Sequence, residues 1–156
     1  MPHIHDKIDF CVDVYIVHNK KVLLRKHDKY KIWLSVGGHV ELDEDPNQAA
    51  IREVKEEVGL DVELINTSKL PMLKEGTHKT LIPPVFLNRH NINEKHEHVS
   101  FVYFAKSKTD KFVMPTDTHE ISEECRWFGK EELDDKKFNL TKHVVLYAKA
   151  ALDMIV

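Results

Sequence analysis

The sequence contains little that would hold a chain together covalently or anchor it in a membrane. Only two of its 156 residues are cysteines, Cys11 and Cys125, and neither has the spacing of a metal-binding cysteine pair. A disulfide framework is therefore not expected, and a reducing, cytoplasmic setting fits best. No apolar run approaches the roughly 18 residues of a membrane span, and the first residues lack the basic and apolar regions of a secretory signal. We expect a soluble protein that is not exported.

Excess positive charge and internal repetition are missing as well. The formal net charge is −3 at pH 7, so the chain lacks the basic surplus with which nucleic-acid-binding proteins neutralise many phosphates. We expect neither stable nucleic-acid binding nor a membrane partner. No repeat or low-complexity segment is visible. A chain of this length can bury roughly two-thirds of its unfolded surface, and we expect one domain over residues 1–156.

The first half of the chain contains a predicted hairpin followed by a predicted helix. Apolar residues dominate 10–17 and recur in 21–25, which indicates two antiparallel strands. Residues 31–36 are expected to form a further short extended piece that the glycine pair 37–38 ends.

The helix is expected over residues 46–58. Asp45 precedes it as an N-cap, Gln48 follows in capping-box spacing, and Pro46 takes the first helical position, where its missing N–H costs nothing. Ala50, Ile51, Val54 and Val58 recur along one face of this helix, and Gly59 should end it in a left-handed conformation.

The second half predicts further strands and one more helix. Broken apolar runs over 61–73 and 80–87 suggest strands of uncertain register, whereas the continuous run 99–105 is typical of a central strand covered on both faces. Asn139 is expected to cap a C-terminal helix whose apolar residues recur at helical spacing. Strands interspersed with two helices predict a mixed α/β layered fold.

An unusual concentration of acidic residues surrounds the predicted helix. Residues 41–57 contain seven acids and two bases, and Glu53, Glu56 and Glu57 fall on one helix face. Like charges at these spacings destabilise a helix by roughly 0.2–0.5 kcal/mol per pair, and the helix dipole disfavours anions near its C-terminus. A hard divalent cation, Mg²⁺ or Mn²⁺, would remove this repulsion. A solvated charged face balanced by Arg52 and Lys55 is the alternative.

The acidic residues also belong to a longer pattern. Gly38 is followed by five residues, Glu44, seven residues, Arg52-Glu53, an aliphatic residue, any residue, Glu56-Glu57, any residue, Gly59 and an aliphatic residue. This segment resembles the Nudix box of the Nudix hydrolase family at every specified position. Residues 126–133 look like the closing strand and short helix of that family.

The resemblance implies a Nudix-type α/β/α sandwich with a mixed β-sheet, and a Mg²⁺-dependent hydrolase for which Mn²⁺ is a possible substitute. Such an enzyme cleaves a pyrophosphate bond in a nucleoside diphosphate linked to another group, or in a related small organic pyrophosphate. By the same resemblance Glu53, Glu56 and Glu57 bind the metal together with the Gly38 carbonyl. Arg52 would orient carboxylates, Glu44 included. Because exposed carboxylates contribute little to stability, substituting Glu56 or Glu57 is expected to leave the fold nearly intact.

The general base varies in position within the family. It is a box glutamate or an acid on a later loop, and in this sequence Glu120 is the first candidate for a later acid, followed by Glu97 and Glu123. An ordinary surface carboxylate is the alternative for each of the three. The reaction is therefore assigned to Glu53, Glu56, Glu57, Arg52 and Glu120.

A few other side chains have two readings. His96 and His98 alternate before the central strand and could be a pair of soft metal ligands, although ordinary loop histidines are the more common case. His39, beside the box glycine, could face the substrate. Three aromatic residues could stack on a base or lie in the core: Tyr30, Trp33 and Phe86.

The sequence does not identify the leaving group. The proline or tyrosine that distinguishes two subgroups of the family about 15–18 residues after the box is absent from that window, which holds residues 75–78. A non-catalytic module that senses a nucleotide or binds a partner is the main alternative, although such a module is expected to lose at least one metal carboxylate. An isomerase of prenyl diphosphates would need cysteine chemistry that Cys11 and Cys125 do not obviously supply.

Overall fold

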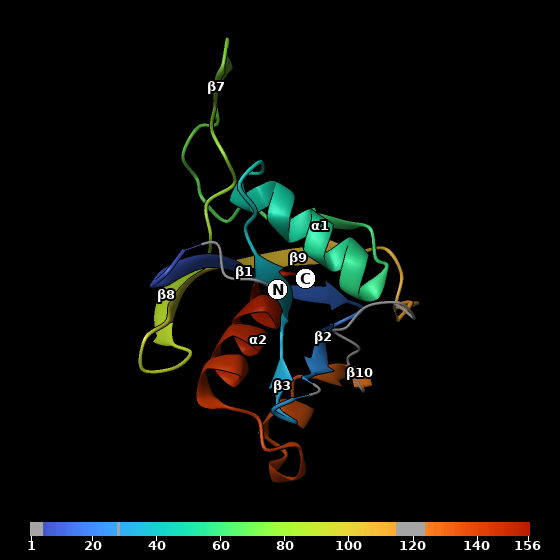
Figure 1. Cartoon of the computed structure of the whole chain (residues 1–156). Coiled ribbons are helices and arrows are strands. Elements are labelled where there is room, and N and C mark those ends of the chain that lie inside the picture. Colours follow the sequence, from blue (N-terminus) through green and yellow to red (C-terminus); the bar gives the residue numbers. More distant parts are fainter. Residues whose placement is uncertain (1–4, 28, 115–123) are drawn as a thin grey trace.

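The computed structural model describes residues 5–27, 29–114 and 124–156. Within these residues the chain forms one large mixed sheet, two α-helices, two short 3-10 helices and one small separate hairpin (Figure 1). The strands are β1 (Ile8–His18), β2 (Lys21–Lys26), β3 (Trp33–Leu34), β4 (Val36–His39), β5 (Val62–Leu64), β6 (Lys74–Glu75), β7 (His78–Lys79), β8 (Phe86–Asn91), β9 (Glu97–Ser107) and β10 (Glu124–Gly129). The helices are α1 (Pro46–Val58), η1 (Glu132–Asp134), η2 (Lys136–Phe138) and α2 (Lys142–Met154).

The large sheet has the strand order β10-β2-β1-β9-β5, with β3 paired to β2, β4 to β1 and β8 to β9. The predicted hairpin is confirmed: β1 and β2 are antiparallel, and Asn19 and Lys20 between them both have positive φ, as the tightest hairpin turns require. β9 lies beside β1 in parallel, so the apolar run 99–105 is an interior strand as expected.

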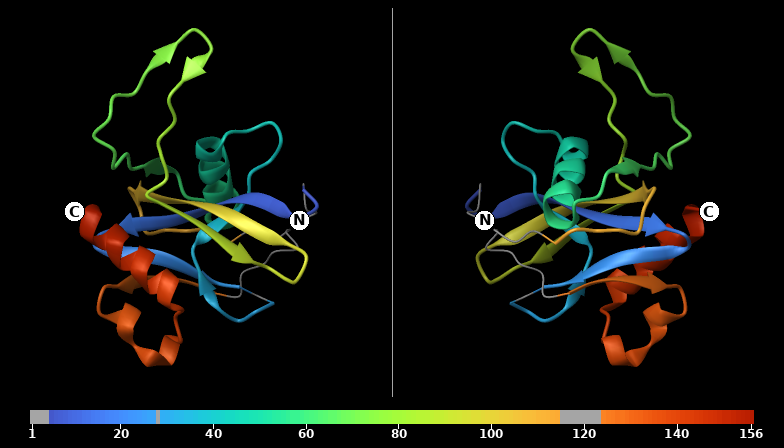
Figure 2. Two further views of the ribbon diagram at one scale, coloured as in Figure 1. Left: turned by 90° about the vertical axis from the view of Figure 1, so that its left-hand side faces the viewer. Right: turned by 90° about the vertical axis from the view of Figure 1, so that its right-hand side faces the viewer.

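The two helices cover opposite faces of this sheet (Figures 1 and 2). Alternation along β1 divides its side chains between two buried clusters, with Val12, Val14 and Ile16 packed under α1 and Tyr15 and Val17 packed under α2. The same alternation continues toward the start of β1, so Asp9, Cys11 and Asp13 face the α2 side of the sheet.

The start and end of α1 match the predictions from the sequence. Asp45 accepts a hydrogen bond from the Gln48 backbone N–H at 2.9 Å, and the Gln48 side chain accepts one from the Asp45 N–H, which completes the capping box. Gly59 has φ 67° and ends the helix in the left-handed conformation. The buried face differs in one position, because Ile51 is exposed and Ala49 takes the buried place beside Ala50.

Three other expectations are wrong. The glycine pair 37–38 does not end an extended segment, because β4 continues through it and pairs with β1. The run 61–73 contains only the short strand β5, and within the run 80–87 only the last two residues are in a strand, at the start of β8. Asn139 does not cap α2, because it follows η2 with φ 49° and Thr141 is the N-cap. The presence of one residue with a capping side chain does not fix where the helix starts, because η2 ends and α2 begins within a few residues of each other.

Between β5 and β8 the chain leaves the body of the molecule. The segment carries the small hairpin of β6 and β7 and extends away from the sheet (Figure 2). Asn47 of α1 fixes the returning end, because its amide accepts from the Ile82 N–H at 2.8 Å and donates to the Ile82 carbonyl at 2.9 Å. No helix in the described part of the chain is long and apolar enough to span a membrane.

Candidate functional site

The acidic face of α1 lies partly inside the protein. The Glu53 side chain is only 3% exposed and the Glu57 side chain 9%, whereas the Glu56 side chain is 58% exposed. The three carboxylates that the helix spacing places on one face therefore occupy different environments. Two of them are buried charges that need partners, since an unpaired buried carboxylate is strongly unfavourable.

Arg52 supplies much of that compensation. Its Nε donates to Glu44 Oε2 at 2.9 Å and its Nη2 to Glu44 Oε1 at 2.6 Å, which is a bidentate pair. Its Nη1 lies 3.0 Å from both Glu53 Oε1 and Glu56 Oε2. The bond to Arg52 lowers the pKa of Glu44, and Glu44 in turn raises the pKa of Arg52. The contact between Arg52 and Glu44 expected from the sequence is present.

Glu57 has a different set of partners. Arg25, on β2, places Nη2 3.0 Å from Glu57 Oε1, and the Gly37 backbone N–H donates to Glu57 Oε2 at 3.0 Å. Both Arg25 and Glu57 are almost completely buried. Sequence reasoning missed Arg25, because a basic residue at the end of an amphipathic strand gives no sign of a carboxylate thirty residues away.

Gly37 and Gly38 are required by close approach rather than by a turn. A Cβ on Gly37 would lie 1.9 Å from the Val12 carbonyl oxygen, which is impossible without moving β1. A Cβ on Gly38 would lie 2.4 Å from Glu53 Oε1. The absence of a side chain at Gly38 therefore leaves room for the carboxylate of Glu53 against the backbone of β4.

These residues present the donors that a hard cation prefers. The carboxylates of Glu53, Glu56 and Glu57 and the backbone of Gly38 provide only oxygen ligands, and the space against Gly38 is filled by a carboxylate instead of a methyl group. Mg²⁺ and Mn²⁺ favour oxygen ligands of this kind. The residues present thus fit a divalent cation, with Arg52 and Arg25 providing the positive charge in its absence.

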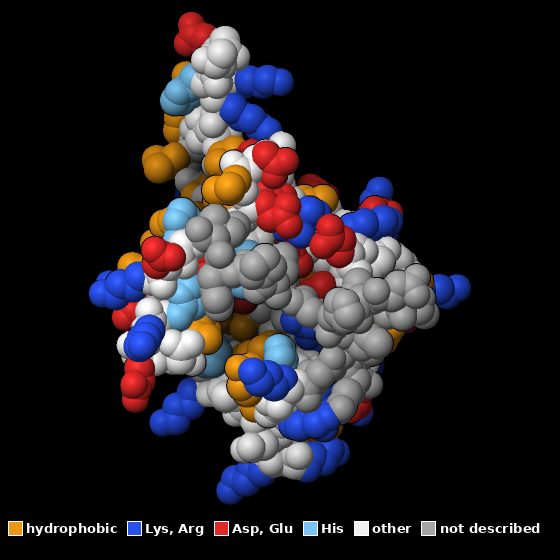
Figure 3. Space-filling view, in the orientation of Figure 1, with side chains coloured by type: hydrophobic (Ala, Val, Ile, Leu, Met, Phe, Trp, Pro, Cys, Tyr) orange, Lys and Arg blue, Asp and Glu red, His pale blue; other side chains and the backbone are white. Residues whose placement is uncertain are grey.

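A cavity of about 600 Å³ reaches the same glycines from the α2 side of the sheet. Figure 3 shows histidine side chains around a hollow on this face. The lining combines backbone from β4 with polar and basic side chains of several elements, among them Asp13, Arg25, His27, Lys29, Tyr30, Ser35, His39, His90, His98, Ser100 and His143. A pocket with this many basic and imidazole groups is suited to an anionic ligand.

Asp13 is a carboxyl group within this lining that the sequence did not single out. Burial raises its pKa above the ordinary aspartate value, against hydrogen bonds from Ser35 and Ser100 that lower it. Ser35 Oγ donates to Asp13 Oδ1 at 3.2 Å. The strand alternation of β1 could have indicated that Asp13 faces the same side as the buried Tyr15.

The three aromatic residues that could stack on a base or lie in the core occupy different environments. Trp33 is buried against Phe128, with ring centroids 5.0 Å apart, and Phe86 packs against Tyr147 at 4.6 Å. Trp33 belongs to the core beneath α2, and the partly buried Phe86 packs against that core. Tyr30 is exposed, lines the cavity and lies 5.0 Å from the ring of His27.

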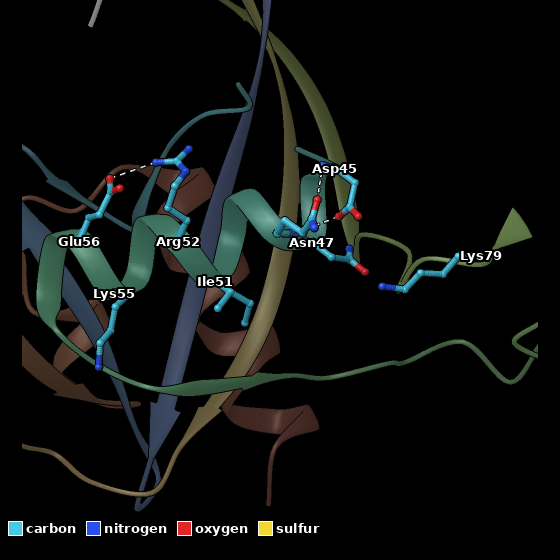
Figure 4. A pocket seen from close by; sticks show the side chains of 8 residues that line it. Asp45, Asn47, Ile51, Arg52, Lys55, Glu56 and Lys79 are labelled. Carbon is cyan, nitrogen blue, oxygen red and sulfur yellow. Dashed lines mark hydrogen bonds and ion pairs between the residues drawn. The ribbon is translucent and has the colours of Figure 1, made fainter. Parts of the chain in front are cut away.

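A second hollow, of about 660 Å³, lies on the outer side of α1. Figure 4 shows its residues: Ile51, Lys55 and Glu56 project from the helix, and Lys79 reaches toward it from β7. Arg52 and Glu56 border this hollow, so these two residues of α1 are accessible from the outside.

Glu97, one of the other predicted acids, is paired away from the box. Glu97 opens β9 and its Oε2 accepts from Arg89 Nε at 2.7 Å, on the neighbouring strand β8. Glu120 and Glu123 lie outside the described residues. His96 and His98, predicted as possible soft ligands, lie close to Asp9 and His39.

A mixed sheet between two helices, with arginine-paired glutamates on one helix, is the arrangement expected of a Nudix fold. Residues 9–148 match the NUDIX domain family. The chain belongs to this family, and the resemblance and fold class expected from the sequence are confirmed.

Individual relatives agree with this assignment. A crystal structure of a NUDIX-family hydrolase from Clostridium perfringens is 32% identical, with a TM-score of 0.82, over 95% of this chain and 98% of that chain. The m7GpppN-mRNA hydrolase NUDT17 of Xenopus laevis is 30% identical over 135 residues, 81% of this chain and 40% of the relative. The dihydroneopterin triphosphate diphosphatase of Escherichia coli (strain K12) is 46% identical over 56 residues, 35% of this chain and 37% of the relative. The matched parts thus span 40% or less of these two curated relatives.

Proposed function

We propose that the protein hydrolyses a pyrophosphate bond in a small anionic substrate, either a nucleoside diphosphate linked to another group or a related organic pyrophosphate. The observation that carries this proposal is the position of the box glutamates, which Arg52 and Arg25 hold beside the glycines that border the cavity. The family of the chain and the complete box support the same reaction.

In this proposal Glu53, Glu56, Glu57 and the Gly38 carbonyl hold a divalent cation, Mg²⁺ or Mn²⁺. When bound, such an ion neutralises phosphate oxygens and activates water for attack on phosphorus. Arg52 acts as a positioning residue, because its contacts are to carboxylates and to the His39 carbonyl at 3.0 Å. It orients Glu53 and Glu56 before the ion arrives, which reduces the cost of assembling the site.

The cavity beside Gly37 and Gly38 is the proposed substrate site. Its volume of about 600 Å³ lies within the range of small-molecule pockets, roughly 300–1,000 Å³. Arg25 and Lys29 supply positive charge for phosphate groups, and Tyr30 offers an exposed ring on which a base or another planar group can stack.

The general base is proposed to be one of the glutamates of the box or a carboxylate from residues 115–123. Glu97 is disfavoured as the base, because Arg89 of the neighbouring strand β8 already binds its carboxylate. Glu120 remains a proposal from the sequence. A base must reach the attacking water to within hydrogen-bond distance, and Glu53 and Glu57 lie closest to the glycine backbone.

A hydrolysis screen with Mg²⁺ tests the proposal. The screen covers nucleoside triphosphates, nucleotide sugars, dinucleoside polyphosphates, dihydroneopterin triphosphate and capped RNA, the last two because the relatives' names contain them. We expect turnover of at least one small pyrophosphate, loss of turnover in excess chelator, and inhibition by Ca²⁺, which tolerates irregular coordination and positions ligands less strictly. Undiminished hydrolysis in excess chelator would contradict the metal assignment.

The alternative is a non-catalytic module that only senses a nucleotide. The complete set of glutamates disfavours it, because Glu53 and Glu57 are buried at a cost that a binding module does not require. Titration calorimetry distinguishes the two: nucleotide binding without turnover across the screen, with Mn²⁺ as well as Mg²⁺, would favour the module and exclude the hydrolase.

A further inference from the structure

One group of side chains beside the proposed substrate cavity has no role in the proposed hydrolysis. Asp9, His39, His96 and His98, here called the histidine cluster, lie together on the α2 side of the sheet, near the start of β1. Asp9 is 1% exposed and His96 is 5% exposed, so a carboxylate and an imidazole are buried side by side.

The sheet register explains why these residues meet. Asp9 and His98 are direct partners across the parallel pair β1 and β9, and their side chains point to the same face. His39 follows Gly38 at the end of β4. The pairing of β4 to β1 places His39 opposite Cys11, which lies on the same face of β1 as Asp9, two residues away. His96 arrives from the turn between β8 and β9, where its carbonyl accepts from the Ile92 N–H at 2.9 Å. Four separate segments thus contribute to one cluster.

The distances within the cluster are those of a coordination set. Asp9 Oδ2 lies 3.2 Å from His96 Nε2 and 3.4 Å from His39 Nε2. Ligand atoms about 2.0–2.1 Å from a tetrahedral Zn²⁺ lie roughly 3.3–3.4 Å from one another. The potential ligand atoms of Asp9, His96 and His98 all lie within 4.8 Å of one another, so small side-chain rotations bring them around one centre.

From this geometry we propose that Asp9, His96 and His98 bind a transition-metal ion of the Zn²⁺ type. His39 is the proposed fourth ligand. Two or three imidazoles with one carboxylate select a borderline ion such as Zn²⁺, whereas Mg²⁺ prefers oxygen donors alone. The site is therefore chemically distinct from the box glutamates on α1.

The surroundings of the cluster support binding of a cation. Asp9 Oδ1 accepts from the His5 backbone N–H at 2.8 Å, which orients the carboxylate as outer partners of metal ligands do. His39 and His98 line the cavity, which gives an ion a path from solvent.

The ion would join the β8–β9 turn to β1 and β4, and would add positive charge to the cavity wall that His39 and His98 line. The first consequence is a stabilisation that depends on Zn²⁺ and not on Mg²⁺, because a ligand that binds only the folded state raises its melting temperature. Neither consequence depends on the hydrolytic reaction being correct.

Metal binding by the protein itself tests the inference. The chelator-treated chain of 156 residues is titrated with Zn²⁺ against a chromophoric chelator in excess Mg²⁺. Co²⁺ is added separately so that its visible absorption reports the coordination. We expect one equivalent of Zn²⁺, a tetrahedral Co²⁺ spectrum, and a higher melting temperature with Zn²⁺. His96→Ala and His98→Ala should each weaken Zn²⁺ binding roughly tenfold or more.

Three controls make the outcome decisive. His78→Ala removes an exposed histidine of β7 outside the cluster and should change nothing. Glu56→Gln should leave Zn²⁺ and Co²⁺ binding unchanged, which separates the cluster from the box. His96→Gln and His98→Asn, conservative in size, are compared with wild type by melting without metal, so that a folding defect is recognised. Equal Zn²⁺ affinity and Co²⁺ spectra in wild type and in the folded His96 and His98 variants would overturn the proposal, as would absence of Zn²⁺ binding in wild type.

Discussion

Two regions that flank the same glycines bring ionisable side chains together in opposite ways. On α1, Glu53, Glu56 and Glu57 are carboxylates whose partners are guanidinium groups. In the histidine cluster, a single carboxylate, Asp9, is surrounded by imidazoles. Guanidinium groups stay charged at every accessible pH, so Arg25 and Arg52 offset part of the negative charge of the acidic face without a metal. Imidazoles can be neutral, and then they are metal ligands rather than counter-ions.

The comparison also separates two roles of burial. The most exposed box glutamate, Glu56, pairs with Arg52, whereas Glu57 binds both Arg25 and the Gly37 N–H and is nearly inaccessible. We expect the exposed Glu56 to contribute mainly to the reaction, and the buried Glu57 to contribute to both the reaction and the stability of the fold. The predictions below change one of these properties at a time.

The largest expected effect follows from Glu56→Gln. A metal ion contributes several kcal/mol of charge stabilisation, and each 1.36 kcal/mol is tenfold in rate, so we expect kcat/KM with Mg²⁺ to fall roughly a hundredfold or more. Because the Glu56 side chain is 58% exposed, the free energy of unfolding measured in urea should change by less than about 0.5 kcal/mol. Glu63→Gln, an exposed acid on β5, is the matched control. Full activity in Glu56→Gln would contradict the assignment.

The next effect concerns Arg52→Lys. Lysine cannot keep two bonds to Glu44 while also reaching Glu53, because its ammonium is a single point charge. We expect the Mg²⁺ concentration for half-maximal activity to rise about 10–100-fold, with activity recovering partly at high Mg²⁺. Arg89→Lys makes the same substitution at an exposed pair with Glu97 and should have no such effect. An unchanged Mg²⁺ dependence would remove Arg52 from its positioning role.

Glu57→Gln tests burial directly. Glutamine can still accept from the Gly37 N–H but leaves the buried Arg25 without a carboxylate. We expect a loss of about 1–3 kcal/mol in the free energy of unfolding, measured in urea without metal. This revises the expectation from the sequence that Glu56 and Glu57 would both be neutral for stability. The double variant with Arg25→Met should recover part of the loss; if Glu57→Gln is as stable as Glu56→Gln, the pair contributes nothing.

The smallest effect is expected at Asp13. Burial raises the pKa of this carboxyl, so the folded state keeps its proton to a higher pH than the unfolded state does. Stability is then lost as pH rises from the ordinary aspartate pKa of about 3.9 through the folded value. Asp13→Asn should therefore be more stable than wild type at pH 7, and the difference should vanish toward pH 3. Melting temperatures of both proteins from pH 3 to 8 check this, and a constant difference would refute it.

Local features were predictable because their interactions are local. The capping box of Asp45 and Gln48 and the left-handed Gly59 depend on residues three or four apart, so α1 was bounded correctly. The hairpin of β1 and β2 is determined by a short turn between alternating strands. The end of β4, by contrast, depends on pairing with β1, a partner more than twenty residues away. The glycines there permit close approach and do not break the strand.

The order of glycine, glutamate and arginine from Gly38 to Gly59 determined by itself the family and the face of α1 that carries the carboxylates. Only the tertiary structure decided that Arg25 reaches Glu57, that Trp33 belongs to the core, and that Asp9 meets His39, His96 and His98. The physical reason is the range of the interactions. Helix spacing is fixed by the backbone within one segment, whereas the histidine cluster depends on the register of several strands, which forms only when the whole sheet packs between its helices.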